Sequence, residues 1–97
     1  MILEFSITPI GSGVSVRAEV AKAVQIVHDS GLKYEVNAMG TVVEGSWDTV
    51  TAVLKRCHDE LLKECERLSI VIKIDSRRGP ASPMEDKVRS VVENLRR

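Results

Sequence analysis

Residues 70–78 carry the clearest chemical signal in this chain, because apolar and polar side chains alternate along them. Isoleucine recurs at every second position, which is typical of a β-strand with one face against a core. Lys73 and Asp75 share the other face, where an ammonium and a carboxylate lie two residues apart. A strand that only covers a core has no need of such a pair. The pattern therefore predicts that the second face of this sheet meets a ligand or another subunit.

The other residues that could do chemistry match no catalytic or metal-binding pattern. Cys57 and His58 are adjacent on a predicted helix, where successive side chains point about 100° apart, so they cannot bind one metal. Adding Cys65 gives no zinc spacing, and we expect His58 to be hydrogen-bonded inside the fold or at a helix interface. The Gly11-Ser12-Gly13 turn matches neither a dinucleotide nor a P-loop motif, although it and Ser15 could hold an anion or an alcohol oxygen. We expect no metal, no cofactor and no catalytic residue, so the sequence favours binding over catalysis.

Period-two and helical patterns predict the elements that position these residues. We expect strands at residues 2–8, ended by Pro9, at 33–39 and 41–44, joined as a hairpin, and at 68–75. Helices are expected over 14–28, after an N-cap at Ser46, and after a Ser82–Glu85 capping box with Pro83 as the first helical residue. This order predicts one domain over residues 1–97. Its class is α+β, a ferredoxin-like β-α-β-β-α-β sandwich with an extra C-terminal helix.

Each of the first two helices should bury one apolar stripe. The expected stripes are Val16, Val20, Ala23, Val24 and Val27 on the first helix, and Trp47, Val50, Val53, Leu54, Cys57 and Leu61 on the second.

The composition limits the classes of partner. Fourteen basic and fourteen acidic residues give a net charge of zero. This balance argues against a nucleic-acid binder and removes a charge repulsion that would oppose self-association. Cys57 and Cys65 lie on one predicted helix with backbones roughly 12 Å apart, too far for a disulfide. Free thiols and no signal peptide predict a cytoplasmic protein, and no apolar run approaches the roughly 20 residues of a membrane span.

A mixed set of side chains falls on the sheet face that the first two helices leave uncovered, which we call the open face. Strand parity places there Glu4, Ser6, Thr8, Glu35, Asn37, Met39, Val71, Lys73 and Asp75, with either Thr41 or Val42. A solvated face is one explanation of mixed polarity. A face that is part apolar and part polar is also common at interfaces, which favours an oligomer contact or a ligand pocket.

These features together resemble the thiamine-binding-protein-like family of small conserved proteins of formerly unknown function. The matching stretches are Ser6, Thr8 and Pro9; Gly11-Ser12-Gly13-Val14-Ser15-Val16; Ser30-Gly31-Leu32-Lys33-Tyr34; Met39-Gly40-Thr41-Val42-Val43-Glu44-Gly45; Trp47-Asp48 and His58; and Lys73-Ile74-Asp75 with Arg77-Arg78. The resemblance implies a ferredoxin-like fold assembled through its sheets into dimers and tetramers. It also implies binding of thiamine or its hydroxymethylpyrimidine part, as in some members of that family. Two departures are Cys65, where relatives tend to have glycine, and Ser76, where they tend to have an acid.

Thiamine joins a cationic thiazolium to an aminopyrimidine. Its site needs hydrogen-bonding groups for the pyrimidine, a flat apolar contact and a nearby carboxylate. The Asn37 side chain can donate and accept hydrogen bonds, and the Met39 thioether offers a polarizable apolar contact to a ring. The predicted ligand-binding residues are Ser6, Thr8, Ser15, Asn37, Met39, Thr41, Glu44, Trp47 and Asp75. For Asn37 a bond within the hairpin, and for Trp47 packing at the helix start, remain alternatives. For Arg77-Arg78 we favour an intersubunit salt bridge.

Three other functions share this topology. A regulatory domain that senses a different small ligand is one alternative, and the sequence does not separate it from thiamine binding. An acylphosphatase needs an arginine in the first loop, and residues 9–16 contain none. An RNA-binding module needs aromatic residues on the open face for base stacking, whereas Phe5 and Tyr34 are expected on the core side.

Overall fold

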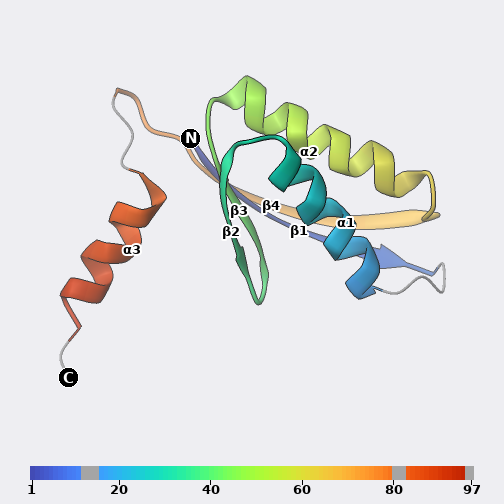
Figure 1. Ribbon diagram of the computed structural model, residues 1–97, viewed down its shortest axis with the longest axis horizontal. Helices are drawn as coiled ribbons and strands as arrows, with labels where there is room; N and C mark the ends of the chain where they lie inside the picture. Colours follow the sequence, from blue (N-terminus) through green and yellow to red (C-terminus); the bar gives the residue numbers. More distant parts are fainter. Residues whose placement is uncertain (12–15, 80–82, 96–97) are drawn as a thin grey trace.

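The computed structural model describes residues 1–11, 16–79 and 83–95. The elements are β1 (Ile2–Ile10), α1 (Val16–Asp29), β2 (Lys33–Asn37), β3 (Gly40–Glu44), α2 (Trp47–Leu62), β4 (Arg67–Asp75) and α3 (Met84–Glu93). The four strands form one antiparallel sheet in the order β2-β3-β1-β4, with α1 and α2 on one face (Figure 1). The predicted ferredoxin-like α+β fold with an extra C-terminal helix is confirmed.

Alternate residues of β1 anchor the core, as their spacing predicts. Leu3, Phe5 and Ile7 are buried between the sheet and the two helices. The register places Ile72 opposite Phe5 and Ile74 opposite Leu3, so both share the core face as predicted. They nevertheless remain 46% and 39% exposed, because β4 is an edge strand. The central strands β1 and β3 therefore supply the buried hydrophobic residues of the sheet.

The register of the β2–β3 hairpin shows which of Thr41 and Val42 lies on the open face. Thr41 lies opposite Phe5 and Val36, so it faces the helices and is buried. Val42 lies opposite Glu4 and Glu35 and belongs to the open face. Ala38 and Met39 form a two-residue turn, so β2 ends at Asn37 and not at Met39 as predicted.

The prediction that Pro9 ends the first strand is wrong. β1 continues to Ile10, with Pro9 opposite Leu68 of β4. On its other side β1 pairs with β3 only over Ile2–Phe5, so Pro9 lies where that side of the strand has no neighbour. A proline is tolerated at such an edge position, because its missing N–H group removes no bond from a central ladder.

The predicted helical stripes are only partly confirmed. On α1, Ala23 and Val27 are buried, but Val16 and Val20 are exposed, while Glu19 and Ile26 are buried in place of them. The Glu19 Oε2 atom has no hydrogen-bond partner in the described residues. On α2 the buried residues are Val50, Leu54, Cys57 and Leu61, whereas Trp47 at the helix start is exposed. The exposed residues of both predicted stripes thus lie toward the N-terminal ends of the helices, whereas Val27 and Leu61 near the C-terminal ends are buried.

Local capping follows the predictions for α1 and α2. Gly31 adopts a positive φ of 77° after α1, which is the usual glycine C-cap conformation. The Ser46 side chain accepts a hydrogen bond from the Thr49 backbone N–H at 3.2 Å. The helix α2 ends without glycine at Lys63, and buried Cys65 follows, with its backbone N–H donating to the Leu61 carbonyl at 3.0 Å. Both cysteines are free, as predicted.

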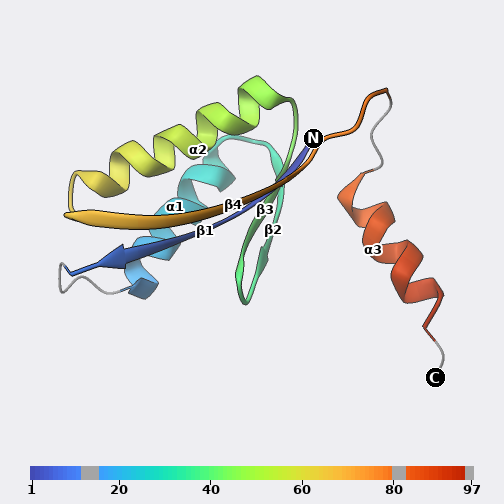
Figure 2. The same cartoon turned by 180° about the vertical axis from the view of Figure 1, so that it is seen from behind.

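The last helix covers one end of the open face, which the sequence predicted to have no cover within the chain. Lys33, Glu44 and Asp75 lie in one row of that face. Glu44 and Asp75 are both paired with Ile2, and Lys33 is paired with Glu44. The first turn of α3 contacts each of them, and the rest of α3 stands apart from the sheet in both views (Figures 1 and 2).

The start of α3 differs from the predicted capping box. Pro83 is the N-cap, not the first helical residue, and makes no side-chain cap bond. Ser82 lies outside the described residues. Within the described ranges, none of the three helices is long and apolar enough to span a membrane.

Candidate functional site

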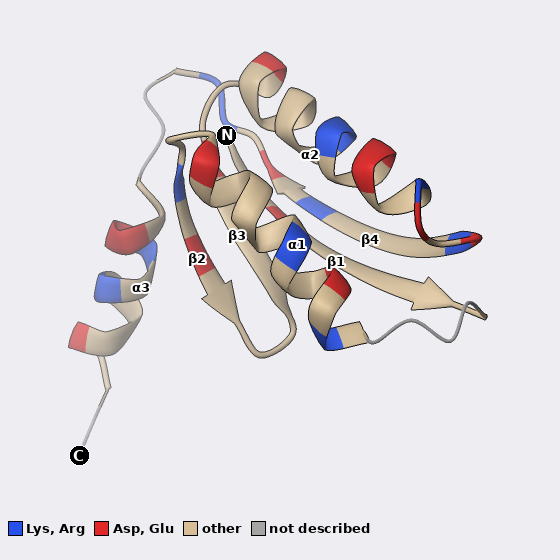
Figure 3. Cartoon of the chain, turned by 45° about the vertical axis from the view of Figure 1, so that its right-hand side comes forward, with Lys and Arg blue, Asp and Glu red and all other residues tan. Residues whose placement is uncertain are grey.

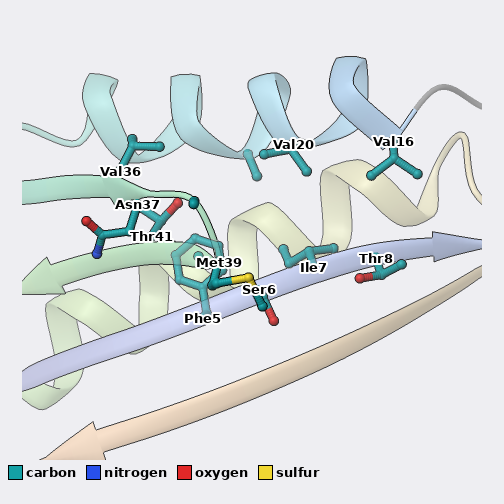
Figure 4. A pocket seen from close by; sticks show the side chains of 13 residues that line it. Phe5, Ser6, Ile7, Thr8, Val16, Val20, Val36, Asn37, Met39 and Thr41 are labelled. Carbon is teal, nitrogen blue, oxygen red and sulfur yellow. The ribbon is translucent and has the colours of Figure 1, made fainter.

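A cavity lies where β1 continues beyond its neighbour β3. β1 pairs with β3 only as far as Phe5, but with β4 as far as Ile10, so the strand has a free edge from Ser6 onward. The start of α1 and the tip of the β2–β3 hairpin border this gap and enclose about 290 Å³ (Figure 4). The lining residues are Phe5, Ser6, Ile7, Thr8, Val16, Val20, Ala23, Val36, Asn37, Ala38, Met39, Gly40 and Thr41.

The close approach of two backbones shapes the hairpin side of the cavity. A Cβ atom at Gly40 would lie 2.8 Å from the Phe5 carbonyl oxygen, a separation that side chains do not tolerate. Glycine therefore lets the hairpin tip come against β1 at the last paired residue, and β3 begins there. The side chains of Asn37 and Met39 are carried on this tip.

The cavity has an apolar side toward α1 and a polar side along the strands. Val16 and Val20 point from α1 toward Ile7, as Figure 4 shows. Their exposure has a structural reason, because the space beneath them is the cavity and not core. Ser6 points away from α1 (Figure 4), whereas Thr41, which is paired with Phe5, lies on the helix side of the sheet. A ligand here can therefore meet apolar contacts on one side and polar groups on the other.

The polar groups of the cavity are free to bond a ligand. Among the described residues, the side chains of Ser6, Thr8, Asn37 and Thr41 make no hydrogen bond to one another or to any other side chain. The unpaired edge of β1 adds backbone N–H and C=O groups at alternate residues. None of the described residues that line the cavity is charged. The site therefore suits a neutral, flat group that both donates and accepts hydrogen bonds.

The size of the cavity indicates a single ring system. Small-molecule sites commonly enclose roughly 300–1,000 Å³, and this cavity lies just below that range. A second, larger hollow of about 530 Å³ adjoins it along α1 and β2 and shares Val20 and Val36. That groove is more open to solvent, and its polar groups include the His28–Tyr34 pair, whose Nδ1 and hydroxyl oxygen lie 2.9 Å apart. We take the smaller, more enclosed cavity as the candidate site.

The structure brings together five of the nine predicted ligand-binding residues. Those that line the cavity are Ser6, Thr8, Asn37, Met39 and Thr41. Glu44 and Asp75 lie at the opposite end of the strands, and Trp47 is exposed at the start of α2, near that end. Ser15 lies outside the described residues.

Glu44 and Asp75 are engaged by α3. The Met84 backbone N–H donates to Glu44 Oε1 at 3.1 Å, and Lys87 is ion-paired with Asp75. The hydrogen bond from Lys87 lowers the pKa of Asp75, and its positive charge adds to the effect. On the other flank, the hydrogen bond to Glu85 raises the pKa of Lys33. The carboxylates expected to meet a cationic ligand are thus part of a helix anchor.

The sequence reasoning missed the α1 side of the cavity. Val16 and Val20 carry helical spacing and were expected in the core, so their exposure was not foreseen. One available signal was Glu19, a charged residue beside them on the same stripe, which is atypical of a purely apolar contact.

The remaining candidates for chemistry are structural. His58 Nδ1 lies 2.9 Å from Asp59 Oδ1, the next residue of α2, in an exposed contact and not in the bond inside the fold or at a helix interface that the sequence predicts. Burial raises the pKa of the Cys57 thiol to about 11, and its Sγ donates to the Ala23 carbonyl at 3.6 Å. A thiol with such a pKa is inert at neutral pH. The described residues contain no group of three or more side chains suited to a metal ion.

Comparison with known proteins gives a consistent set of matches. The family model described as thiamine-binding protein matches residues 3–92. UPF0045 protein MJ1052 of Methanocaldococcus jannaschii is 37% identical over 93 residues, which is 96% of this chain and 93% of that protein. UPF0045 protein MT1949 of Mycobacterium tuberculosis is 40% identical over 98 residues, covering all of this chain and 96% of that protein.

Two solved structures extend the comparison to the fold. The crystal structure of MJ1052 superposes with a TM-score of 0.85 at 37% identity and covers 95% of both chains. A Thermotoga maritima protein, described as a candidate thiamine biosynthesis or salvage protein, superposes with a TM-score of 0.83. That match covers 93% of this chain and 96% of the other at 22% identity, so it shows the shared fold alone.

Proposed function

Because this chain belongs to the thiamine-binding protein family, we propose that it is a non-catalytic protein that binds thiamine or its hydroxymethylpyrimidine moiety in the cavity between β1, α1 and the β2–β3 hairpin. The observation that carries this proposal is the gap beside β1. There an unpaired strand edge and four unbonded polar side chains border an uncharged cavity of about 290 Å³.

The aminopyrimidine ring suits this gap better than the thiazolium does. The ring is flat and neutral at pH 7, and its amine and ring nitrogens alternate as donor and acceptors, as the groups of a strand edge do. Asn37 and Thr41 add side-chain partners, and Val16, Val20 and Met39 offer apolar contact to its faces. The cationic thiazolium finds no carboxylate in the lining, so we place it toward solvent.

This placement makes a quantitative prediction about the two ligands. If the pyrimidine occupies the cavity and the thiazolium lies outside, hydroxymethylpyrimidine retains most of the affinity of thiamine. Titration calorimetry of the purified full chain with each compound measures this directly. Dissociation constants within about tenfold of each other agree with the placement. Tight binding of thiamine with none of hydroxymethylpyrimidine contradicts it, and no saturable heat with either compound contradicts the proposed function.

Thr41 offers a test that leaves the shape of the cavity almost unchanged. The substitution Thr41→Val removes one hydroxyl from a buried position, and we expect it to weaken binding by about 3- to 10-fold, the value of one hydrogen bond. The matched control is Thr51→Val on α2, whose hydroxyl donates to the Trp47 carbonyl at 2.6 Å, away from the cavity. If the two variants bind the ligand with equal affinity, Thr41 does not contact the ligand.

The alternative functions receive less support from the geometry. Neither an arginine nor any other cation lines the described cavity wall, so it has no group to hold an acyl phosphate. Phe5 is buried and Tyr34 contacts His28 on the helix side, so neither is placed on the open face for base stacking. A sensor of another neutral heterocycle would use the same cavity, and it is the conclusion if neither compound binds.

A further inference from the structure

The candidate cavity adjoins a second hollow along the outer side of α1, which we call the outer groove. The groove encloses about 530 Å³ between α1 and β2, an edge strand of the sheet. Val20 on α1 and Val36 on β2 line both hollows, so the cavity and the groove meet at these two side chains (Figure 4). Both valines are exposed, at 37% and 56%. A substituent on a ring bound in the cavity can therefore extend past them into the groove.

The outer groove differs from the cavity in charge. None of the described residues that line the cavity is charged, whereas Arg17 lines the groove and no described carboxylate accompanies it there. Within the described ranges, Arg17 makes no ion pair and no side-chain hydrogen bond. An exposed guanidinium with unused donors is thus the charged group next to a neutral cavity.

Arg17 lies at the end of the groove that meets the cavity. It is three residues before Val20 on α1, so the two side chains are neighbours on one face of the helix. The other residue of the groove that can be positively charged is His28, about 16 Å farther along the helix axis. Its Nδ1 already lies 2.9 Å from the Tyr34 hydroxyl oxygen. A short substituent that leaves the cavity therefore reaches Arg17 and not His28.

The chemistry of Arg17 selects an anion of a particular shape. The planar guanidinium presents parallel N–H donors, which match two oxygens of a phosphate and form strong, charge-assisted bonds. Arg17 is in the first turn of a 14-residue helix, where the positive end of the helix dipole also favours an anion. The same charges do not attract a cationic group such as a thiazolium.

We propose that the site takes its ring ligand as a phosphate ester, with the pyrimidine of hydroxymethylpyrimidine monophosphate in the cavity and its phosphoryl group on Arg17 in the outer groove. This inference rests on the proposed function and specifies the form of the ligand. The phosphoryl group is attached through the single methylene carbon that bears the thiazolium in thiamine. Such a short link suits a charged group directly beside the cavity.

Titration calorimetry of the full chain with hydroxymethylpyrimidine and with its monophosphate tests the proposal. We expect the ester to bind about tenfold more tightly, the value of one hydrogen-bonded charge pair at an exposed position. Added salt should reduce this preference, because the pair is open to solvent, and should leave the affinity for the neutral alcohol the same.

Two substitutions in the outer groove should remove the preference. Arg17→Gln removes the cation, so we expect the ester and the alcohol to bind equally. Ala21→Glu adds a carboxylate to the groove at an exposed helical position outside the cavity lining, so we expect it to weaken binding of the ester. The matched controls on the exposed side of α2 are Arg56→Gln and Ala52→Glu, and both should keep the preference.

The possible failures of the two proposals are distinguishable. If the alcohol binds and the ester binds no more tightly, this inference is wrong and the proposed function stands. The same holds if the preference for the ester persists in Arg17→Gln, because another group then binds the phosphate. If neither compound binds, the proposed function fails and this inference fails with it.

Discussion

The two ends of the sheet carry similar polar side chains and use them differently. At the α3 end, Lys33, Glu44 and Asp75 each bond to a residue in the first turn of α3. At the hairpin end, Asn37 and Thr41 make no side-chain bond within the described residues. Figure 3 shows the same contrast in charge, because α3 and the start of β2 carry acidic and basic residues, whereas the tip of the β2–β3 hairpin carries none.

This difference shows that residue type alone does not identify a binding residue. Glu44 and Asp75 have the charge that a cationic ligand would prefer, but both carboxylates are already bonded to residues of α3. Asn37 and Thr41 are less conspicuous, but they line a cavity and retain unbonded groups. Polar groups that are free and border a concave surface are the better indicators of a ligand site.

The largest expected effect comes from damage to the hairpin end. Gly40→Ala places a Cβ atom 2.8 Å from the Phe5 carbonyl oxygen, so the hairpin tip must move away from β1. Overpacking of this kind costs roughly 1–3 kcal/mol, and the cavity should lose its shape as well. We expect a lower melting temperature by differential scanning calorimetry and a loss of ligand affinity.

Gly45→Ala is the comparison for that experiment. A Cβ atom there would lie 3.0 Å from Val50 Cγ2, the end of a side chain that can shift, so the loss of stability should be smaller. Equal losses in the two variants, or retained affinity in Gly40→Ala, would show that the close approach of the hairpin does not shape the site.

A smaller and more local effect is expected at the α3 end. Glu44→Ala removes the acceptor of the Met84 backbone N–H, which is worth about 0.5–1.5 kcal/mol. Because α3 contacts the sheet only through its first turn, we expect faster amide hydrogen exchange in α3 with little change elsewhere. Glu35→Ala, on the same face but without a partner in the described residues, is the control. An equal loss of ligand affinity in Glu44→Ala would mean that the two ends are not independent.

Strand parity was predictable because it depends only on the alternation of side chains along one strand. Leu3, Phe5 and Ile7 therefore fell on the expected face. The choice between Thr41 and Val42 was not predictable, because it depends on how many residues the turn at Ala38 takes.

The extent of the site depends on contacts between distant segments. The cavity exists because β3 pairs with β1 only as far as Phe5, which no pattern within β1 reveals. Val20 has the spacing of a core residue, and only the position of α1 over the gap exposes it. The seating of α3 on Glu44 is likewise a contact across 40 residues of sequence. The sequence thus indicated several of the residues that line the candidate cavity, but not the gap beside β1 that forms it.

The smallest expected effect is a difference in pH dependence between the two ends. The hydrogen bond from Lys87 lowers the pKa of Asp75 in the folded protein. The Asp75–Lys87 pair therefore contributes fully to the anchoring of α3 above about pH 3.9, the pKa of Asp75 in the unfolded chain, and this contribution is lost as the pH falls through the lowered pKa of the folded state. The hydrogen bond to Glu85 raises the pKa of Lys33 in the folded protein. The Lys33–Glu85 pair therefore contributes fully below about pH 10.4, the pKa of lysine in the unfolded chain, and this contribution is lost as the pH rises through the raised pKa of the folded state. Between these limits the anchor is constant.

The described lining of the cavity contains no titratable group, so ligand affinity should not follow either loss. Amide exchange of α3 and calorimetric affinity for hydroxymethylpyrimidine, measured at the same series of pH values from neutrality toward the acid limit, compare the two ends directly. Added salt should loosen α3, because its ion pairs are exposed, and should leave the affinity unchanged. An affinity that falls with salt in parallel with the protection of α3 would show that the anchor and the ligand site act together.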